Sequence, residues 1–477
     1  MGTWQPRNEH RPSGRRLRVR RALTLAAGLL GCTELSGRAP VDAAAVDASA
    51  VDASAVDVAQ LGDGASRCAQ GSKVSVTRAT HWGTATPGGM FSMPSARAGW
   101  VDAAGRLVVA GQCVGCGAER LVASRLAVWR FDAATLALDP SFGAGGAFLD
   151  ADASRRMFSE ALGVISGGDG RLLVFGHDSA MGNNNRAVLL RLNADGTLDP
   201  SFAEGGRLAL PRTVFGSPRP VVAFAGLHDA RGTVLLVNDG GHWAYQSQSA
   251  WAVRVDDTGA LDASFGIGGV VALSSSAGCF DLAAQGEGYV LACITLSRQP
   301  QLVRLDGRGQ RAPWPMGEAG VATQAPQRFE VRSLDRDSRG RWLVAGAWSP
   351  IYNDIASVGM AVRFSAEGAP DRGYGADGLA TAFGPRCSFA YGFRDLATLT
   401  CDDRLVFGGN IDAEPTAQVF NADGRALSAL GDQGIVRLAP TGERATANAV
   451  VPIGGTNDLV VIASSQPETF SLYRLSQ

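Results

Sequence analysis

"LNADGTLDPSFAEGG", residues 192–206, contains a D-G turn signal, a proline, one aromatic residue and a double glycine within a short span. Related stretches begin at Phe131, Val255, Leu305, Phe364 and Phe420. The glycines that end the six stretches lie at positions 146, 206, 269, 320, 378 and 434, at intervals of 60, 63, 51, 58 and 56 residues. This spacing indicates one supersecondary unit repeated along the chain. We therefore interpret the stretch as scaffolding rather than as a site.

The unit that contains this stretch predicts four short strands. "EALGVISG" (160–167) and "RLLVFGH" (171–177) are apolar runs on either side of "GDG", which predicts two strands joined by a tight turn. "AVLLRLN" (187–193) predicts a third strand, and "RLALP" (207–211) predicts a short fourth one. Four antiparallel strands in about 60 residues, with no helical pattern between them, are typical of the blades of a β-propeller.

The two ends of the chain indicate that the ring of blades is closed. The final segment, 448–477, supplies only three strands, and "HWGTATP" (81–87) predicts an isolated strand near the front. If that N-terminal strand completes the last blade, no strand edge is left exposed. Six complete units and this composite one predict an all-β fold over residues 71–477. The predicted fold is a seven-bladed β-propeller of four-stranded antiparallel blades, with the N-terminal strand completing the last blade.

One aromatic side chain recurs at the same place in the unit. Its apolar bulk favours packing between neighbouring blades over a role in ligand binding. The residues at this place are Phe142, Phe202, Phe265 and Tyr374, and we expect Trp314 and Leu430 to fill it in the remaining units.

The motif "RLNADGTLDPSFAEGG" resembles the delta-60 repeat, a bacterial module found in exported and surface proteins. The similarity covers roughly residues 90–440 and is strongest in the second unit. The resemblance implies a propeller-like repeat protein outside the cytoplasm. It implies no established activity, and it supplies no catalytic residues.

The N-terminus predicts export and lipid anchoring. "RRLRVRRALTLAAGLLGC" (15–32) joins a cluster of arginines to a short apolar run that is too short to span a bilayer. Its end resembles a bacterial lipobox, so we predict a lipoprotein signal peptide over 1–31 and lipidation of Cys32. By resemblance to sorting rules, Thr33 favours the outer membrane or cell surface. The alternatives are an ordinary signal peptide with an incidental cysteine, or a buried apolar segment.

The following residues, 32–70, predict a disordered tether. Val-Asp pairs recur every five residues among alanines, and such small and charged residues cannot bury enough surface to become ordered. Formal net charge is −1, but the first 31 residues hold seven arginines and one glutamate, which leaves the remainder near −7. This charge gives no reason to expect nucleic acid as a partner. Lys73 is the only lysine among 44 basic residues, which we attribute to coding bias.

No catalytic, metal or cofactor site is predicted. Asn193, Asp195 and Asp199 are spaced loosely like a calcium loop, but the further oxygen ligands of such a loop are missing, so a turn is favoured. The five histidines show no metal-binding spacing, and the sequence has no nucleophile elbow or phosphate loop.

Seven cysteines follow Cys32, and in an exported protein they predict disulfides. Cys279 and Cys293 flank a predicted turn, which favours a cross-strand bond. Cys113 with Cys116 predicts a bond that braces a small loop, with a metal or redox pair as the alternative. Cys387 with Cys401 is a further candidate pair, and Cys68 is left over.

The stretches that join the second and third strands differ most between units. They carry Trp243, Tyr245, Trp348 and Tyr352, which are candidate contacts for a partner protein or a glycan, or side chains that pack the loops locally. We therefore predict a lipid-anchored envelope propeller that binds or scaffolds a protein or glycan, without catalysis. The alternative is an exported polysaccharide hydrolase or lyase with a site in the central channel, since propeller folds host both kinds of function.

Overall fold

The structure is a computed structural model of the chain. It describes residues 75–81, 93–102, 104–114, 124–150, 158–180, 184–240, 249–274, 276–315, 320–348, 358–382, 397–430, 432–439, 442, 444–465 and 469–476. All of them belong to the compact unit Val51–Gln477. The predicted signal peptide, Cys32 and the tether lie outside the described residues. Among the described residues, no helix is long and apolar enough to cross a membrane.

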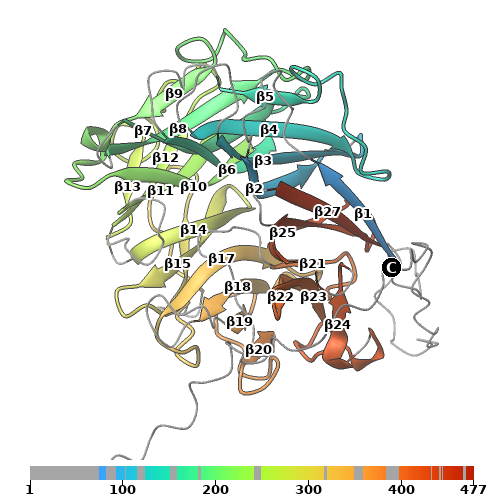
Figure 1. The fold of residues 1–477 in the computed structure, drawn as a ribbon. Helices are drawn as coiled ribbons and strands as arrows, with labels where there is room; N and C mark the ends of the chain where they lie inside the picture. The colour runs from blue at the N-terminus through green and yellow to red at the C-terminus, as the bar shows by residue number, and fades with distance from the viewer. Residues whose placement is uncertain are drawn as a thin grey trace, which may run out of the picture. The chain divides into compact units, whose positions relative to one another are not determined.

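The strands form seven antiparallel blades (Figure 1). In six of them the strands follow one another in the chain, and the seventh also contains the first described strand. Blade 1 contains β2 (Met93–Val101), β3 (Arg106–Val114), β4 (Ser124–Asp132) and β5 (Ala147–Leu149). Blade 2 contains β6 (Phe158–Ser166), β7 (Leu172–Ala180), β8 (Asn184–Leu192) and β9 (Arg207–Leu210). Blade 3 contains β10 (Val221–Asp229), β11 (Gly232–Asp239), β12 (Ala250–Val255) and β13 (Val270–Ala272).

Blade 4 contains β14 (Ser276–Gln285), β15 (Gly288–Thr295) and β16 (Pro300–Leu305), and its fourth position is reduced to one bridge between Gln301 and Val321. Blade 5 contains β17 (Phe329–Arg336), β18 (Trp342–Trp348), β19 (Val358–Phe364) and β20 (Leu379–Ala382). Blade 6 contains β21 (Ala397–Leu399), β22 (Leu405–Ile411), β23 (Glu414–Phe420) and β24 (Ile435–Arg437). Blade 7 contains β25 (Ala445–Pro452), β26 (Leu459–Ser465), β27 (Thr469–Ser476) and β1 (Ser75–His81).

The described helical turns are short 3-10 segments, Arg212–Phe215, Ser428–Leu430 and Asp432–Gly434. The prediction of an all-β, seven-bladed propeller is therefore confirmed. The innermost strand of each blade lies against that of the next blade, and β25 of the last blade lies against β2 of the first.

The N-terminal strand completes the last blade, as predicted, but its position in the sequence differs from the prediction. β1 pairs with β27 from Ser75 opposite Ser476 to His81 opposite Phe470. The predicted strand, 81–87, therefore overlaps β1 at His81 alone. Residues 75–81 hold valine and two threonines, which favour strands, whereas 81–87 contains a glycine and ends in a proline, which weaken them. Figure 1 shows β1 beside β27.

We expect a chain that begins at residue 82 to self-associate, because removal of β1 exposes the hydrogen-bonding edge of β27. A chain that begins at residue 75 keeps this pairing and serves as the matched control. Size-exclusion chromatography with light scattering should show oligomers for the shorter chain only. A monomer of unchanged melting temperature from residue 82 onward would contradict the role of β1.

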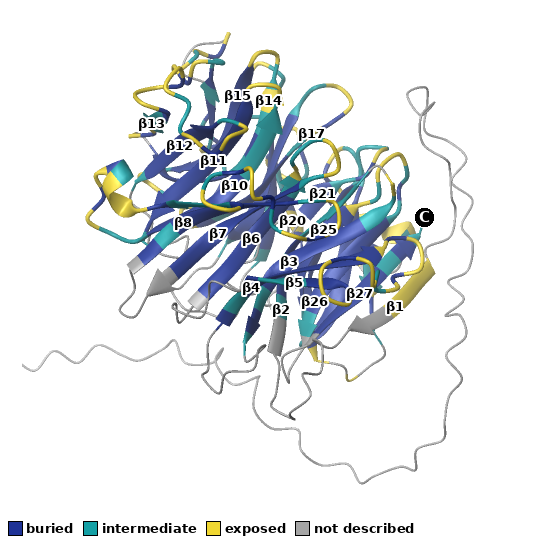
Figure 2. Ribbon diagram, turned by 90° about the horizontal axis from the view of Figure 1, so that it is seen from above, coloured by how far each residue is buried: buried dark blue, intermediate teal, exposed yellow. Residues whose placement is uncertain are grey.

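The core is divided among the blade interfaces. Six of the seven apolar clusters each join two neighbouring blades, including blades 7 and 1. The seventh cluster extends over blades 2 to 5. In Figure 2 the strands are mostly buried and the turns at their ends are exposed. Stability therefore depends on contacts between neighbouring blades.

Candidate functional site

The recurring aromatic side chains lie at the blade interfaces. Phe142, Phe202, Phe265 and Tyr374 are each at most 2% exposed. At Phe142, Phe265 and Tyr374 a glycine in the turn of the following blade lies close to the ring: at Gly196, with φ +85°, a Cβ would lie 2.8 Å from the Phe142 ring. Trp314 takes this place in blade 4, where a Cβ on Gly368 would lie 2.3 Å from its ring. Leu430 is half-buried beside the cluster between blades 6 and 7.

An arginine on the third strand clamps each aromatic ring. Arg191 Nε donates to Asp199 Oδ2 over 2.8 Å, and its Nη2 donates to the Ser201 hydroxyl over 3.0 Å. Its Nη1 crosses to blade 3 and donates to the carbonyl of Asp257 over 2.6 Å. The guanidinium lies 4.6 Å from the Phe202 ring centroid, which is a cation–π contact. One side chain thus joins the turn of its own blade to the next blade.

The same clamp occurs in three further blades. In each, Nε donates to an aspartate of the same blade, Nη1 donates to a carbonyl of the next blade, and the guanidinium lies over the interface aromatic ring. These clamps are Arg130 with Asp139, Ala194 and Phe142; Arg254 with Asp262, Gly307 and Phe265; and Arg363 with Asp371, Ala422 and Tyr374. The repeated motif therefore functions as a connection between blades.

The aspartates of the motif stabilise turns. Asp199 Oδ1 accepts hydrogen bonds from the backbone N–H and the hydroxyl of Ser201, and Asp195 Oδ1 accepts from the N–H and hydroxyl of Thr197. The described residues contain no group of three or more His, Cys, Asp or Glu side chains arranged to hold a metal ion.

These hydrogen bonds predict acid sensitivity. The Ser201 hydroxyl, together with Arg191, holds the pKa of Asp199 below its usual range against the opposing effect of burial, and Ser141 does the same for the pKa of Asp139. A carboxyl whose pKa is lower in the folded state contributes stability above its unfolded pKa of about 3.9, and this contribution is lost as pH falls through the folded pKa. We expect the free energy of unfolding to fall between about pH 5 and pH 2. Urea titrations should show a shallower fall for Ser201→Ala, and equal slopes would contradict the assignment.

The innermost strands carry β-bulges whose side chains pack together around the axis. Register shifts in β6, β10 and β14 present Leu162, Phe224 and Phe280, which are all buried in one cluster. The rings of Phe224 and Phe280 meet edge to face with centroids 5.4 Å apart. In other blades the bulges present polar side chains that are already paired: Arg97 with Glu160, Arg332 with Glu330, and Asn448 with the carbonyl of Ala96.

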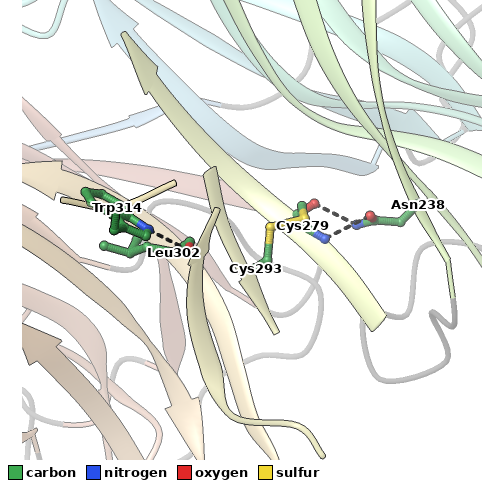
Figure 3. Close-up of a disulfide and its surroundings, with 5 residues drawn as sticks. All are labelled: Asn238, Cys279, Cys293, Leu302 and Trp314. Atoms are coloured by element: carbon green, nitrogen blue, oxygen red, sulfur yellow. Dashed lines mark hydrogen bonds between the residues drawn. A yellow bond between two sulfur atoms is a disulfide. The ribbon is translucent and has the colours of Figure 1, made fainter. Parts of the chain in front are cut away.

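The Cys279–Cys293 disulfide is confirmed. The two cysteines are directly opposite on β14 and β15, with Cα atoms 3.9 Å apart. At the bulge beside Cys279, its N–H and carbonyl bond to the side-chain amide of Asn238 in blade 3, over 3.0 and 2.8 Å (Figure 3). The disulfide therefore cross-links two strands of blade 4 at a place where hydrogen bonds join blade 4 to blade 3.

Removal of this disulfide should lower the free energy of unfolding by about 2–4 kcal/mol, the usual range for a short closed loop. We expect this loss in the Cys279→Ala/Cys293→Ala double variant, measured by urea unfolding. The Cys279→Val/Cys293→Val pair retains the side-chain volume and should lose a similar amount if the cross-link itself stabilises the fold. A valine pair as stable as the wild type would assign the loss to packing instead.

The other predicted site residues are only partly within the described structure. Cys113 and Cys401 are each disulfide-bonded, whereas Cys116 and Cys387 lie outside the described residues, so both pairings stay predictions. Trp243, Tyr245 and Tyr352 also lie outside them. Trp348, at the end of β18, donates from its indole N–H to the carbonyl of Gln327 over 3.0 Å. This bond ties the end of β18 to the segment that precedes β17, and the role of Trp348 as a partner contact stays a prediction.

The sequence analysis missed the clamping arginines. An arginine stands immediately before five of the six related stretches, at positions 130, 191, 254, 304 and 363. Attributing the excess of arginine to coding bias left this signal unused. A further missed signal is glycine on the second strand: at Gly111, Gly176 and Gly346 a Cβ would lie 2.0 Å from a carbonyl oxygen of the bulged strand.

One comparison, with a family model, agrees with a propeller. A family model described as a domain of unknown function (DUF5122) beta-propeller matches residues 167–202. No curated protein matches the chain. Among solved structures, the chain is similar to the N-terminal domain of Nup159, with 10% identity, a TM-score of 0.44, and 81% of this chain and 90% of that chain covered. It is also similar to a puromycin hydrolase mutant complexed with PGG, with 12% identity, a TM-score of 0.42, and 78% and 50% covered. For the Myceliophteria thermophila Cps50 (Swd1) beta-propeller domain, identity is 10%, the TM-score is 0.42, and 80% and 97% are covered. The family match, limited to blade 2, is consistent with a propeller repeat family.

Proposed function

We propose that this protein is a binding or scaffold module of the bacterial cell envelope, anchored by a lipid on Cys32 at the outer membrane or cell surface. Its ligand is a protein or a glycan, and we expect no catalysis. The ligand binds at the loop face, by which we mean the end of the blades that carries the loops between second and third strands. Trp243, Tyr245 and Tyr352 are the proposed contacts.

The packing around the axis carries this proposal. Leu162, Phe224 and Phe280 are buried against one another there, and Glu160 and Glu330 form ion pairs with arginines. A hydrolase or lyase with a site in the central channel would need acidic groups that are open to substrate. The described innermost strands therefore favour a rigid support for the loops.

A binding screen with matched variants tests the proposal. The purified protein is applied to a glycan array and, with a photo-crosslinker, to cell-envelope extracts. We expect each specific ligand to bind at least about tenfold more weakly to the Trp243→Ser/Tyr245→Ser variant, which corresponds to about 1.4 kcal/mol. Ile267→Ser, at the opposite end of the blades and 90% exposed, is the control and should bind normally. A ligand that both variants bind equally well would contradict the assignment to the loop face.

Lipid anchoring is tested separately. Labelled palmitate should be incorporated into the wild-type protein in cells and not into Cys32→Ser, which should appear in the soluble fraction. Incorporation into Cys32→Ser would contradict the assignment.

A further inference from the structure

The clamp is incomplete in blade 4. Arg304 occupies the same place on β16 that Arg191 occupies on β8, and its guanidinium lies 5.1 Å from the Trp314 ring centroid. Eight residues after Arg191 stands Asp199, whereas eight residues after Arg304 stands Ala312. The backbone register is conserved, because the N–H of Ala312 donates to the carbonyl of Arg304 over 3.0 Å, as that of Asp199 does to Arg191 over 2.9 Å. Blade 4 thus keeps the arginine, the aromatic ring and the backbone register of the clamp, but it has alanine where blades 1, 2, 3 and 5 have the aspartate.

Arg304 is left without an acidic partner among the described residues. Its Nη1 donates to the carbonyl of Pro313 over 2.9 Å, and no described carboxylate lies within ion-pair distance. In blades 1, 2, 3 and 5 the equivalent Nε donates to an aspartate over 2.6–2.9 Å. A guanidinium presents a planar fork of donors that fits a carboxylate, and in blade 4 the one described acceptor of this fork is the carbonyl of Pro313.

The side chain of Ala312 borders a hollow between blades 3 and 4, which we call the blade 4 hollow. Its volume is about 1030 Å³, and both Arg304 and Ala312 line it. It lies at the end of the blades that carries the turns between first and second strands, opposite the loop face. A ligand of the size of a small saccharide therefore has access to Arg304.

The charges that line the blade 4 hollow are of both signs. Four arginines and three acidic residues, one of them the exposed Glu287, line it. Arg231 pairs with Asp229. Arg254 pairs with Asp262, and Asp306 Oδ1 accepts the backbone N–H groups of Arg308 and Gln310. Arg304 and the exposed Arg308 remain without a described acidic partner.

The remaining lining groups suit a polyhydroxylated ligand. Gln285 and Gln310 supply amides and Ser264 supplies a hydroxyl. Such groups can donate to and accept from sugar hydroxyls.

We propose that the blade 4 hollow binds an acidic saccharide through a carboxylate that pairs with Arg304. The ligand carboxylate takes the place that an aspartate of the chain occupies in the four complete clamps. Lining amides and the Ser264 hydroxyl hold the sugar hydroxyls. This site is separate from the loop face, so the test of this proposal does not depend on the proposed function.

The decisive variant restores the missing carboxylate. Ala312→Asp recreates the Asp-Pro pair of blades 1 and 2, because Pro313 follows residue 312 as Pro140 follows Asp139. We expect Ala312→Asp to fold with an equal or higher melting temperature, since it restores the carboxylate that pairs with the arginine in the other clamps. The same change should weaken ligand binding at least about tenfold, because the new carboxylate competes for Arg304.

Titration calorimetry with trigalacturonate measures this effect on the purified protein. The fully methyl-esterified trisaccharide, which has no charge, is the ligand control and should not bind. Arg304→Met should also weaken binding at least about tenfold, whereas Arg425→Met, an exposed arginine at the corresponding turn of blade 6, should not. Galacturonate monomer that binds more weakly than the trimer would support a saccharide site.

Three results would overturn the proposal. They are no binding of trigalacturonate at millimolar concentration, equal binding of the methyl ester, and binding unchanged by Ala312→Asp. Since Ala312→Asp should not reduce the melting temperature, a loss of binding in that variant is distinguishable from a loss of folding.

Discussion

Phe202→Ala should lower the free energy of unfolding by about 3–5 kcal/mol, among the largest losses that a single substitution causes in this protein. The Phe202 side chain is 1% exposed and packs in the cluster between blades 2 and 3. Its removal leaves a cavity and takes away the ring beneath the Arg191 guanidinium. Both effects weaken the same interface.

Phe202→Leu tests whether another large apolar side chain can fill the same place. The equivalent position in blade 6 holds Leu430, so the fold tolerates leucine in this place. We expect Phe202→Leu to lose clearly less stability than Phe202→Ala, and Ile267→Ala, at an exposed position, to change it by less than about 0.5 kcal/mol. Urea unfolding followed by tryptophan fluorescence measures all three. A loss below about 1 kcal/mol in Phe202→Ala would contradict the interface role.

The fold could be predicted from the sequence because the repeats can be recognised by their turn residues. Glycines such as Gly196 recur at positions where a positive φ and a close ring contact are both required. Apolar runs of strand length between such turns then define the blades. Trp314 could be placed at its interface by alignment alone, although its repeat has lost the Ser-Phe pair.

The closing strand was harder to place than the blades. β1 contributes seven residues outside any repeat, and its exposed residues Val76 and Arg78 carry no burial pattern. Both 75–81 and 81–87 have residues that suit a strand. The glycine and proline of 81–87 are a weak local signal against that segment, and the pairing with β27 decides between the two.

The roles of the site residues were harder to predict from the sequence, because these roles depend on contacts between blades. Nothing in the local sequence shows that Arg191 reaches the carbonyl of Asp257 in the next blade. The blade 4 hollow was missed for a related reason. Ala312 is informative only once Arg304 is known to need a carboxylate at that position.

The arginine clamp leads to a second large effect. Arg191→Met should lower the free energy of unfolding by about 3–5 kcal/mol, as is typical when one partner of a buried ion pair is removed. Arg191 is 7% exposed and Asp199 is 4% exposed, so water cannot replace the lost contacts fully. Arg171 Nε lies 3.2 Å from Asp199 Oδ2, so Asp199 keeps one positively charged neighbour in the variant. This contact keeps the loss of unfolding free energy within this range.

Arg191→Lys separates charge from geometry. A lysine keeps the positive charge, but its ammonium cannot reach Asp199, Ser201 and the carbonyl of Asp257 with the planar fork that these acceptors require. We therefore expect Arg191→Lys to lose about 2 kcal/mol, whereas Arg425→Lys, at an exposed turn, should lose less than about 0.5 kcal/mol. If Arg191→Lys were as stable as the wild type in urea unfolding, the clamp would act through charge alone. The presence of arginine at these positions would then have no structural cause.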